Sequence, residues 1–243
     1  MVLRIFHRDK VFNPGEKIDE YTVLRLIGEG RFGICYLVTQ DGQQFIVKQL
    51  KKAMFKKNQG KVGFEEEILS KIQHHSVPRI IKKVELSDSY FYVLESKAGT
   101  TFEELIYTQN RVFSTAEIYQ IGLQLIDIMQ YLHSNGVVHR DIRVPNVLYH
   151  GTKVYLVDFG LARWIGGKYT PDIDYAYFGD FLLHLLYTAY TSEDNRKVPW
   201  YDELSLEPNQ VEFLKRLLDS QKLYNNIAEI EKDFHLAFCQ LSE

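Results

Sequence analysis

Two short motifs at a fixed distance constrain this 243-residue chain more than any other feature. Residues 139–141 read His-Arg-Asp, and Asn146 follows Asp141 by five positions. Twelve residues after Asn146, residues 158–160 read Asp-Phe-Gly and directly follow the apolar run 154–157, which reads as a strand. Carboxylate and amide oxygens are the ligands that hard divalent cations prefer. The spacing therefore predicts that two acids and one amide converge on a single site.

Each of these residues alone has a simpler explanation. A lone Asp usually forms a turn or caps a helix, and Asp-Phe-Gly by itself is an ordinary turn after a strand. Residues 7–9 also read His-Arg-Asp, but Pro14 stands five residues after Asp9 and offers no ligand atom. The joint occurrence at positions 141, 146 and 158 is what indicates chemistry.

Composition limits the class of protein. A hydrophobic content of 45% supports a real core, and a net charge of −3 argues against the broad basic surface of a nucleic-acid binder. Cys35 and Cys239 are too few for a disulfide framework, which favours a reducing compartment. Residues 1–14 do not read as a signal peptide, and the longest apolar stretch, 178–190, is too short to span a bilayer. We expect a cytoplasmic protein without membrane insertion.

A glycine-rich stretch, Gly-Glu-Gly-Arg-Phe-Gly at 28–33, suits a loop that approaches phosphates closely. In a dinucleotide-binding fold, a helix would follow, with an acid about 20 residues on to hold a ribose. Here residues 34–39 and 43–47 read as two strands joined by a type I′ turn at Asp41-Gly42. Lys48 stands twenty residues after Gly28, and its charge is opposite to what a ribose needs.

Taken together, these motifs resemble those of the protein kinase-like superfamily, and most closely the small eukaryotic-like (Hanks-type) Ser/Thr kinases of bacteria. The resemblance runs from about Tyr21 to the C-terminus, with the motifs in the family's order. It implies a bilobal α+β fold with a five-stranded antiparallel sheet and one helix, followed by a mainly α-helical lobe. We expect one kinase domain over 1–243, with an N-lobe at 1–94, a hinge at 95–99 and a reduced C-lobe at 100–243.

The resemblance assigns roles in phosphoryl transfer. Asp141 would accept the proton of the attacking hydroxyl, and Asn146 with Asp158 would hold Mg²⁺ or Mn²⁺. Arg143 would offset charge on the transferring phosphoryl group. It stands where Ser/Thr kinases usually carry Lys, so a planar fork replaces a point charge.

Lys48 is placed as the lysine that holds the ATP α and β phosphates. The alternative is an ordinary solvated lysine at a strand end. A helix pattern over 63–72 supplies the carboxylate that the resemblance requires as its partner, and Glu65 is our choice. Glu66 and Glu67 are competing candidates, but the apolar face of Ile68, Leu69 and Ile72 puts Glu65 on the inner side.

The resemblance also implies a set of ATP-binding residues in the glycine-rich loop, the hinge and the apolar walls of an adenine pocket. The apolar members would also read as plain core. They are Ile27, Gly28, Glu29, Gly30, Arg31, Phe32, Gly33, Cys35, Ile46, Lys48, Leu94, Glu95, Lys97 and Leu148.

The second lobe reads as helical. Ser114 and Glu117 form a capping box that opens a long helix, which ends at Asn135-Gly136. Residues 174–190, 208–218 and 227–238 read as three further helices.

The segment after Asp-Phe-Gly is shorter than in ordinary kinases. Residues 159–173 separate Asp158 from Asp174, which aligns with the Asp that anchors the central helix, and no Ala-Pro-Glu occurs. In the family, an Arg near the last helices holds the Glu of Ala-Pro-Glu, and Tyr224 aligns with that Arg here. The groove for a peptide is therefore expected to be reduced.

Arg140 pairs in the family with a phosphate on the activation loop. Tyr169 and Thr170 are the hydroxyl-bearing residues of the short segment. We predict that activity does not require phosphorylation at either, because the segment is too short to fold back.

The resemblance favours an ATP-dependent Ser/Thr protein kinase that also phosphorylates itself. Small-molecule kinases of this fold also lack Ala-Pro-Glu, so such an enzyme is the first alternative. However, those enzymes commonly depart from the His-Arg-Asp and Asp-Phe-Gly motifs, which this chain keeps. A nucleotide-binding regulatory or scaffold protein is the second.

A cluster of lysines precedes the helix of Glu65. A solvated loop is one explanation, and a docking patch for an anionic regulator, nucleic acid or acidic protein, is the other. The cluster is Lys51, Lys52, Lys56, Lys57 and Lys61.

Overall fold

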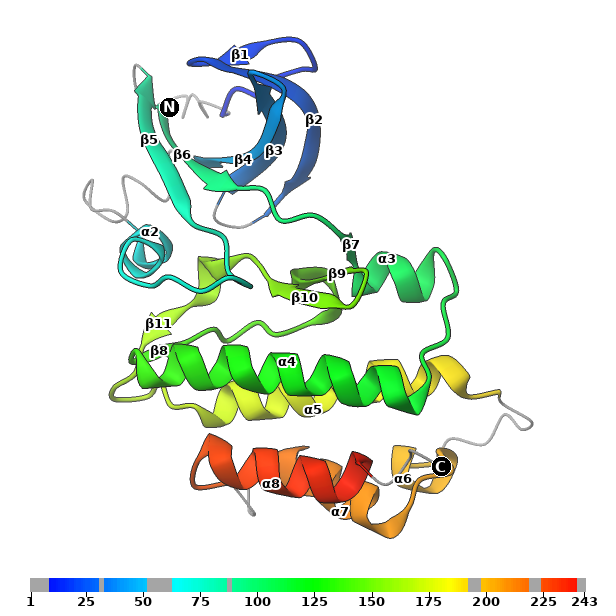
Figure 1. The fold of residues 1–243 in the computed structure, drawn as a ribbon. Helices are drawn as coiled ribbons and strands as arrows, with labels where there is room; N and C mark the ends of the chain where they lie inside the picture. Colours follow the sequence, from blue (N-terminus) through cyan, green and yellow to red (C-terminus); the bar gives the residue numbers. More distant parts are fainter. Residues whose placement is uncertain are drawn as a thin grey trace, which may run out of the picture. The chain divides into compact units, whose positions relative to one another are not determined.

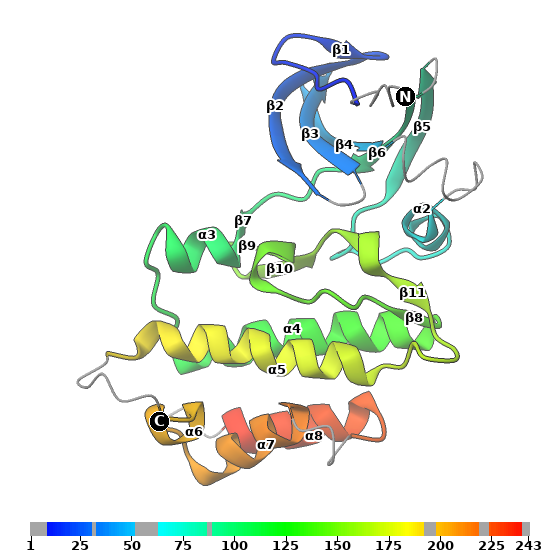
Figure 2. The ribbon, with the colours of Figure 1, turned by 180° about the vertical axis from the view of Figure 1, so that it is seen from behind.

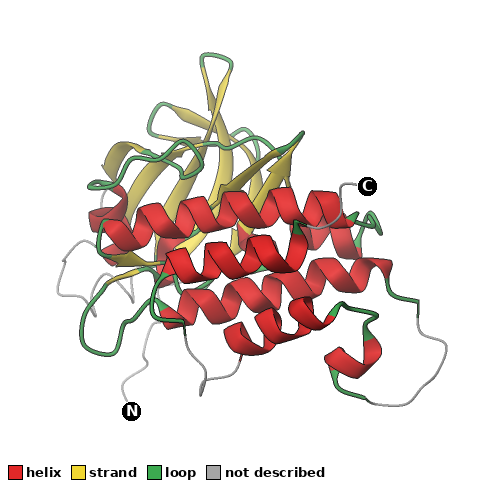
Figure 3. Cartoon of the chain, turned by 60° about the horizontal axis from the view of Figure 1, so that its bottom comes forward, coloured by secondary structure: helices red, strands yellow, loops and turns green. Residues whose placement is uncertain are grey.

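The computed structural model describes residues 9–30, 33–51, 63–86, 89–191, 198–218 and 224–239. These residues form two compact units. Unit 1 contains the described residues up to Gln73 together with Pro78–Ser96, and unit 2 contains His74–Val77 and the described residues from Lys97 onward. Strands dominate unit 1 and helices dominate unit 2, as the colouring of Figure 3 shows, which confirms the predicted α+β class.

Unit 1 is built on a curled antiparallel sheet that carries one short helix, α2 (Phe64–Leu69) (Figure 1). The sheet has the order β1-β2-β3-β4-β6-β5. Its strands are β1 (Lys17–Ile18), β2 (Tyr21–Glu29), β3 (Gly33–Gln40), β4 (Gln43–Leu50), β5 (Ile80–Leu86) and β6 (Ser89–Glu95). Five strands were predicted, and the sixth, β1, pairs only two residues with β2, too short a stretch to give a period in the sequence.

The β3–β4 hairpin turns as predicted. Asp41 and Gly42 both have positive φ, 49° and 80°, as a type I′ turn requires. The predicted helix over 63–72 is shorter than expected, and α2 has Gly63 at its N-cap with no side-chain cap.

The N-terminal segment before β1 takes part in the core of unit 1. Phe12 is 9% exposed, and its ring makes edge contacts at 5.9 Å with the rings of Tyr36 and Phe91. The hydroxyl of Tyr36 accepts a hydrogen bond from the backbone N–H of Phe12 and donates one to Gln49 Oε1. Phe12 of this segment thus packs into the apolar cluster to which strands β2, β3, β4 and β6 contribute.

Unit 2 combines a helical layer with two small sheets, ordered β10-β9-β7 and β11-β8. Its strands are β7 (Thr100–Thr101), β8 (Val137–Val138), β9 (Val147–His150), β10 (Lys153–Leu156) and β11 (Arg163–Trp164). Its α-helices are α3 (Phe102–Tyr107), α4 (Thr115–Ser134), α5 (Asp172–Leu186), α6 (Trp200–Glu203), α7 (Pro208–Leu218) and α8 (Ile227–Phe238). Three 3₁₀ turns complete it: η1 (Val144–Asn146), η2 (Phe159–Leu161) and η3 (Tyr187–Ala189).

Helices α4 and α5 lie side by side, and α7 and α8 pack against them (Figures 1 and 2). The capping box of Ser114 and Glu117 opens α4 as predicted, and Asn135 caps its end. A Cβ at Gly122 would lie 2.2 Å from the ring of Phe234, so the contact between α4 and α8 depends on that glycine. None of the helices in the described parts of the chain has the length and hydropathy needed to cross a membrane.

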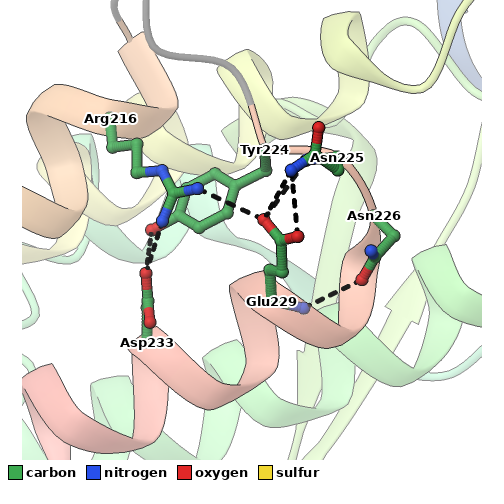
Figure 4. A network of polar contacts seen from close by, with 6 residues as sticks. All are labelled: Arg216, Tyr224, Asn225, Asn226, Glu229 and Asp233. Atoms are coloured by element: carbon green, nitrogen blue, oxygen red, sulfur yellow. Dashed lines mark hydrogen bonds and ion pairs between the residues drawn. The ribbon is translucent and has the colours of Figure 1, made fainter.

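Tyr224 belongs to a polar network that joins α7 to α8 (Figure 4). Arg216 of α7 pairs with Asp233 at 2.9 Å and with Glu229 at 3.2 Å. The guanidinium carbon of Arg216 lies 3.9 Å from the centroid of the Tyr224 ring, and the Tyr224 hydroxyl donates to Asp233 Oδ2 at 3.1 Å. Burial, followed by the charge of Asp233, raises the pKa of Tyr224, so the hydroxyl stays a donor. The network thus joins α7, α8 and Tyr224, which precedes α8.

We expect Tyr224→Phe to lower the free energy of unfolding by about 1–2 kcal/mol, because Tyr224 is 3% exposed and the change removes the hydrogen bond from its hydroxyl to a charged acceptor. Tyr201→Phe is the matched control. Tyr201 is 39% exposed and its ring contact with Lys215 survives the change, so its effect should stay below about 0.5 kcal/mol. Thermal unfolding followed by circular dichroism measures both, and equal midpoints for the two variants would contradict this account.

Candidate active site

In the glycine-rich stretch between β2 and β3, Gly30 N–H donates to Gly33 O at 2.9 Å. A Cβ at Gly33 would lie 2.5 Å from Gln49 O, so the fold itself requires that glycine. A Cβ at Gly28 or Gly30 would meet nothing within 4 Å. The fold does not require glycine at these two positions. Close approach of a phosphate group to the backbone does require it, because a Cβ would stand in the way. Glu29 is the residue between them, and Arg31 and Phe32 lie outside the described residues.

Lys48 on β4 and Glu65 on α2 form a buried ion pair in unit 1. The ammonium of Lys48 lies 2.8 Å from Glu65 Oε1 and 2.6 Å from Oε2, and the two residues are 5% and 6% exposed. A lysine held in this way has a fixed direction in a low-dielectric environment. It is suited to neutralise phosphate oxygens.

The two competing glutamates have other partners. Glu66 accepts a hydrogen bond from the Tyr90 hydroxyl at 2.6 Å and forms an ion pair with Lys83. Glu67 pairs with Lys71 at the surface of the same helix. The apolar face of Ile68, Leu69 and Ile72 predicted Glu65 as the inward-facing glutamate, and Glu65 is the one that contacts Lys48. The sequence did not indicate the partners of Glu66, because these lie on distant strands.

The residues expected to surround adenine are divided between the units. In unit 1, Leu94 is 7% exposed and Ile27 is 46% exposed, with Cys35 and Ile46 half-buried. Leu148, on β9, is half-buried in unit 2.

The two hinge residues of the set also have partners within their own units. The backbone N–H of Glu95 donates to Arg79 O at 2.9 Å, and Lys97 Nζ donates to His75 O at 2.9 Å. The assignment of the whole set to adenine stays a prediction.

Asp141 is the centre of a polar cluster in unit 2. Its carboxylate accepts from Arg143 Nε at 2.5 Å, from Arg143 Nη2 at 3.1 Å and from Asn146 Nδ2 at 2.7 Å. Asn146 Nδ2 also donates to Asp141 O at 3.0 Å, which turns the amide so that its oxygen points away from the carboxylate. Asp141 is 7% exposed and Arg143 is exposed. The hydrogen bond to Asp141 raises the pKa of Arg143, so its cation is permanent.

Asp158 lies at the N-cap of η2 in a left-handed conformation, with φ 59° and ψ 80°. Its Oδ1 accepts from Gly160 N–H at 3.2 Å. Arg140 also has positive φ, 68°, a conformation that is uncommon for non-glycine residues and costs about 1–3 kcal/mol. Such strain persists only where surrounding contacts impose it, and it gathers at functional sites. The oxygen donors of Asn146 and Asp158 are of the type that Mg²⁺ takes.

Asp174 imposes the conformation of the segment that precedes Asp141. It lies at the start of α5 and is 0% exposed. Its carboxylate accepts from the backbone N–H of His139 at 2.9 Å and of Arg140 at 2.6 Å, and it lies 2.9 Å from His133 Nε2. Burial lowers the pKa of His139, whose Nε2 contacts Val157 O at 3.2 Å. The backbone that precedes Asp141 is therefore held to Asp174 of α5, and the His139 side chain contacts Val157, the residue after β10.

Arg140 makes its side-chain contacts inside the short segment. Its Nη1 donates to Leu161 O at 3.1 Å, and its guanidinium carbon lies 4.7 Å from the ring centroid of Tyr169. A tight turn presents that ring, since Gly166 and Tyr169 form a β-bridge with backbone hydrogen bonds in both directions. Sequence reasoning missed this contact, because it treated Tyr169 only as a hydroxyl.

Three further residues in unit 2 have the composition of a metal site. Ligand atoms of His74, His75 and Asp127 lie within 4.8 Å of one another. However, His74 Nδ1 accepts from Ser76 N–H at 3.3 Å, and burial lowers the pKa of His74. A neutral ring that accepts at Nδ1 carries its proton at Nε2, the atom that faces Asp127 at 3.4 Å, and a protonated nitrogen does not bind a metal ion. We therefore interpret the pair as a hydrogen bond.

The lysine cluster is mostly outside the structural description. Lys51 pairs with Glu29 at 2.6 Å, and Lys52, Lys56, Lys57 and Lys61 lie outside the described residues.

The comparisons with known proteins reported below all identify protein kinases. The family model described as "Protein kinase domain" matches residues 21–189. The probable serine/threonine-protein kinase YbdM of Bacillus subtilis (strain 168) is 32% identical over 228 residues, which cover 90% of this chain and 89% of that protein. The serine/threonine-protein kinase TIO of Arabidopsis thaliana is 32% identical over 154 residues, and dkf-2 of Caenorhabditis briggsae is 29% identical over 150. Those alignments cover 60% and 59% of this chain but only 11% and 13% of the two longer proteins.

Proposed function

The chain belongs to the protein kinase family, and from this premise we propose that it transfers the γ-phosphate of ATP to serine and threonine hydroxyls of proteins, its own chain included. ATP binding follows from the family. The observation that carries the proposal is the cluster around Asp141, whose carboxylate is fixed by the amide of Asn146 and the guanidinium of Arg143. A carboxylate oriented by two side chains is suited to accept the proton of an attacking hydroxyl.

The remaining roles follow from the chemistry of the groups. Lys48, oriented by Glu65, would neutralise the α and β phosphates, and the open faces of Gly28 and Gly30 leave room for phosphate oxygens. Asn146 and Asp158 would hold Mg²⁺ or Mn²⁺, which would offset the negative charge of the phosphates. Arg143 would place its cation beside the transferring group.

Incubation of the purified chain with γ-labelled ATP and Mg²⁺ tests the proposal. One arm contains the chain alone, a second adds generic proteins such as casein or myelin basic protein, and a third adds a panel of small alcohols and amino alcohols. We expect label on serine and threonine of the chain and of the added protein. Label confined to a small molecule would replace the proposal with a small-molecule kinase, and no transfer in any arm would indicate a binding protein.

Activity is expected without phosphorylation of the short segment. The contact of Arg140 with the Tyr169 ring uses no phosphate, and it survives when the hydroxyl is removed. The double variant Tyr169→Phe with Thr170→Ala should therefore keep at least half of the parent rate, whereas Tyr169→Ala, which removes the ring, should reduce the rate about tenfold or more. Initial rates of γ-phosphate transfer measure both. An inactive but folded double variant would show that phosphorylation is required after all.

The anionic regulator stays a prediction for this chain. It would act at Lys51, Lys52, Lys56, Lys57 and Lys61, which precede α2 in the sequence and so would influence the helix of Glu65.

A further inference from the structure

Helix α2 has little to hold it in place by itself. It contains six residues, and its N-cap, Gly63, has no side chain to satisfy the first backbone N–H groups. Isolated helices of this length are not stable in water, so the position and rotation of α2 depend on tertiary contacts. Successive residues of a helix point about 100° apart, so the rotation of α2 about its axis decides which side chain faces Lys48. A change in that rotation would turn Glu65 away from the lysine.

The register of the sheet supplies such contacts. Lys48 on β4 and Lys83 on β5 both pair with Tyr92 on β6, and Tyr90 lies two residues from Tyr92. Directly paired residues, and residues two apart on one strand, share a face of a sheet. One face therefore presents two lysines and the Tyr90 hydroxyl from three adjacent strands, and α2 meets that face with two successive carboxylates, Glu65 and Glu66.

Glu66 is the more deeply buried of the two carboxylates, at 1% exposure. Its Oε2 accepts from the Tyr90 hydroxyl at 2.6 Å, and its Oε1 faces the ammonium of Lys83. Tyr90 is 8% exposed, and burial followed by the hydrogen bond to Glu66 raises the pKa of Tyr90, so the hydroxyl is a permanent donor. Any rotation of α2 would leave this buried carboxylate without partners, which is strongly unfavourable.

We propose that Glu66 is a positioning residue, which sets the rotation of α2 through Tyr90 and Lys83 and thereby holds Glu65 on Lys48. This inference rests on the proposed function, because it assigns the Lys48–Glu65 pair to ATP. It gives the adjacent glutamates different tasks: Glu65 orients the lysine, and Glu66 orients Glu65.

The test is a variant that keeps the packing but removes the polar anchor. Glu66→Leu with Tyr90→Phe replaces a buried carboxylate and its donor by apolar groups of similar size, and Lys83, the other partner of Glu66, has an exposed side chain. Such replacements of buried ionic groups usually preserve stability. Glu67→Leu is the matched control, one residue further along the same helix, where the carboxylate pairs with Lys71 at the surface.

The measured quantities are kcat, KM for ATP and the unfolding midpoint of the full chain. We expect the Glu66→Leu/Tyr90→Phe variant to unfold within a few degrees of the parent but to lose about tenfold or more in kcat/KM for ATP. Glu67→Leu should stay within about twofold of the parent. Adding Glu65→Gln to the double variant should cause no further loss beyond that of Glu65→Gln alone, since both changes act through the same ion pair.

Parental kcat/KM in the folded double variant would overturn the inference. So would a loss that multiplies with that of Glu65→Gln, because Glu66 would then act independently of Glu65. If the double variant does not fold, Tyr90→Phe alone is carried through the same cycle and decides the matter. A parent chain that transfers no phosphate refutes the proposed function instead, and normal activity of Glu65→Gln removes the role of the ion pair and this inference with it.

Discussion

Replacing Asp141 with alanine is expected to reduce the rate of phosphoryl transfer by a factor of about 10²–10⁴, the range that a positioned general base contributes. The substitution removes the acceptor of the hydroxyl proton. It also removes the group that Arg143 Nε and Asn146 Nδ2 contact at 2.5 and 2.7 Å, so Arg143 loses this ion pair, while Asn146 keeps its hydrogen bond to the backbone oxygen of residue 141. Single-turnover transfer of labelled γ-phosphate measures the chemical step.

Asp141→Asn separates the two effects. The amide keeps an oxygen that accepts from Asn146 but lacks the basicity of a carboxylate, so the rate should fall nearly as far as with alanine. Asp9→Ala is the matched control, because Asp9 ends the second His-Arg-Asp tripeptide of the chain. A parental rate in Asp141→Ala, or equal losses at Asp9 and Asp141, would remove Asp141 from the role of proton acceptor.

Replacing Lys48 is expected to produce the second large effect, a loss of about 10²–10³ in kcat/KM for ATP, similar to the loss of one electrostatic donor at a transition state. The alanine variant alone is ambiguous, because it leaves the Glu65 carboxyl group buried, at 6% exposure, and without its lysine. Breaking a buried pair in this way typically costs about 3–5 kcal/mol of stability. Some of the loss of activity would then come from unfolding.

The double variant Lys48→Met with Glu65→Gln resolves this ambiguity. It removes both charges together, so we expect the unfolding midpoint to return toward that of the parent while phosphoryl transfer stays low. Calorimetry and steady-state kinetics on the same preparations give the two numbers. Recovery of activity together with stability would show that Lys48 has a structural role only.

Local signals in the sequence were sufficient for several elements. The Asp41-Gly42 turn forms because both residues tolerate positive φ, and the Ser114 box opens α4 because its partners lie three residues apart. Helices α7 and α8 begin and end where the apolar periodicity predicts. In each case, the groups that decide the structure lie within one or two turns of chain.

Some elements were set by contacts that no local pattern records. Strand β1 is two residues long, and Phe12 is buried because the rings of Tyr36 and Phe91 happen to lie around it. The sequence therefore predicted five strands for the N-terminal sheet, which has six among the described residues.

The candidate site also combines features that the sequence predicted with features that depend on tertiary contacts. By itself, the sequence determined which residue types carry the chemistry, since the spacing of Asp141, Asn146 and Asp158 is a property of the chain alone. Only the tertiary structure decided which groups these residues and their neighbours contact. Arg140, for example, contacts the ring of Tyr169. The tertiary structure also decided that Glu66, next to Glu65, is held by Tyr90 and Lys83. The physical reason is that a partner is chosen by strand register and helix rotation, and these depend on residues far apart in the sequence.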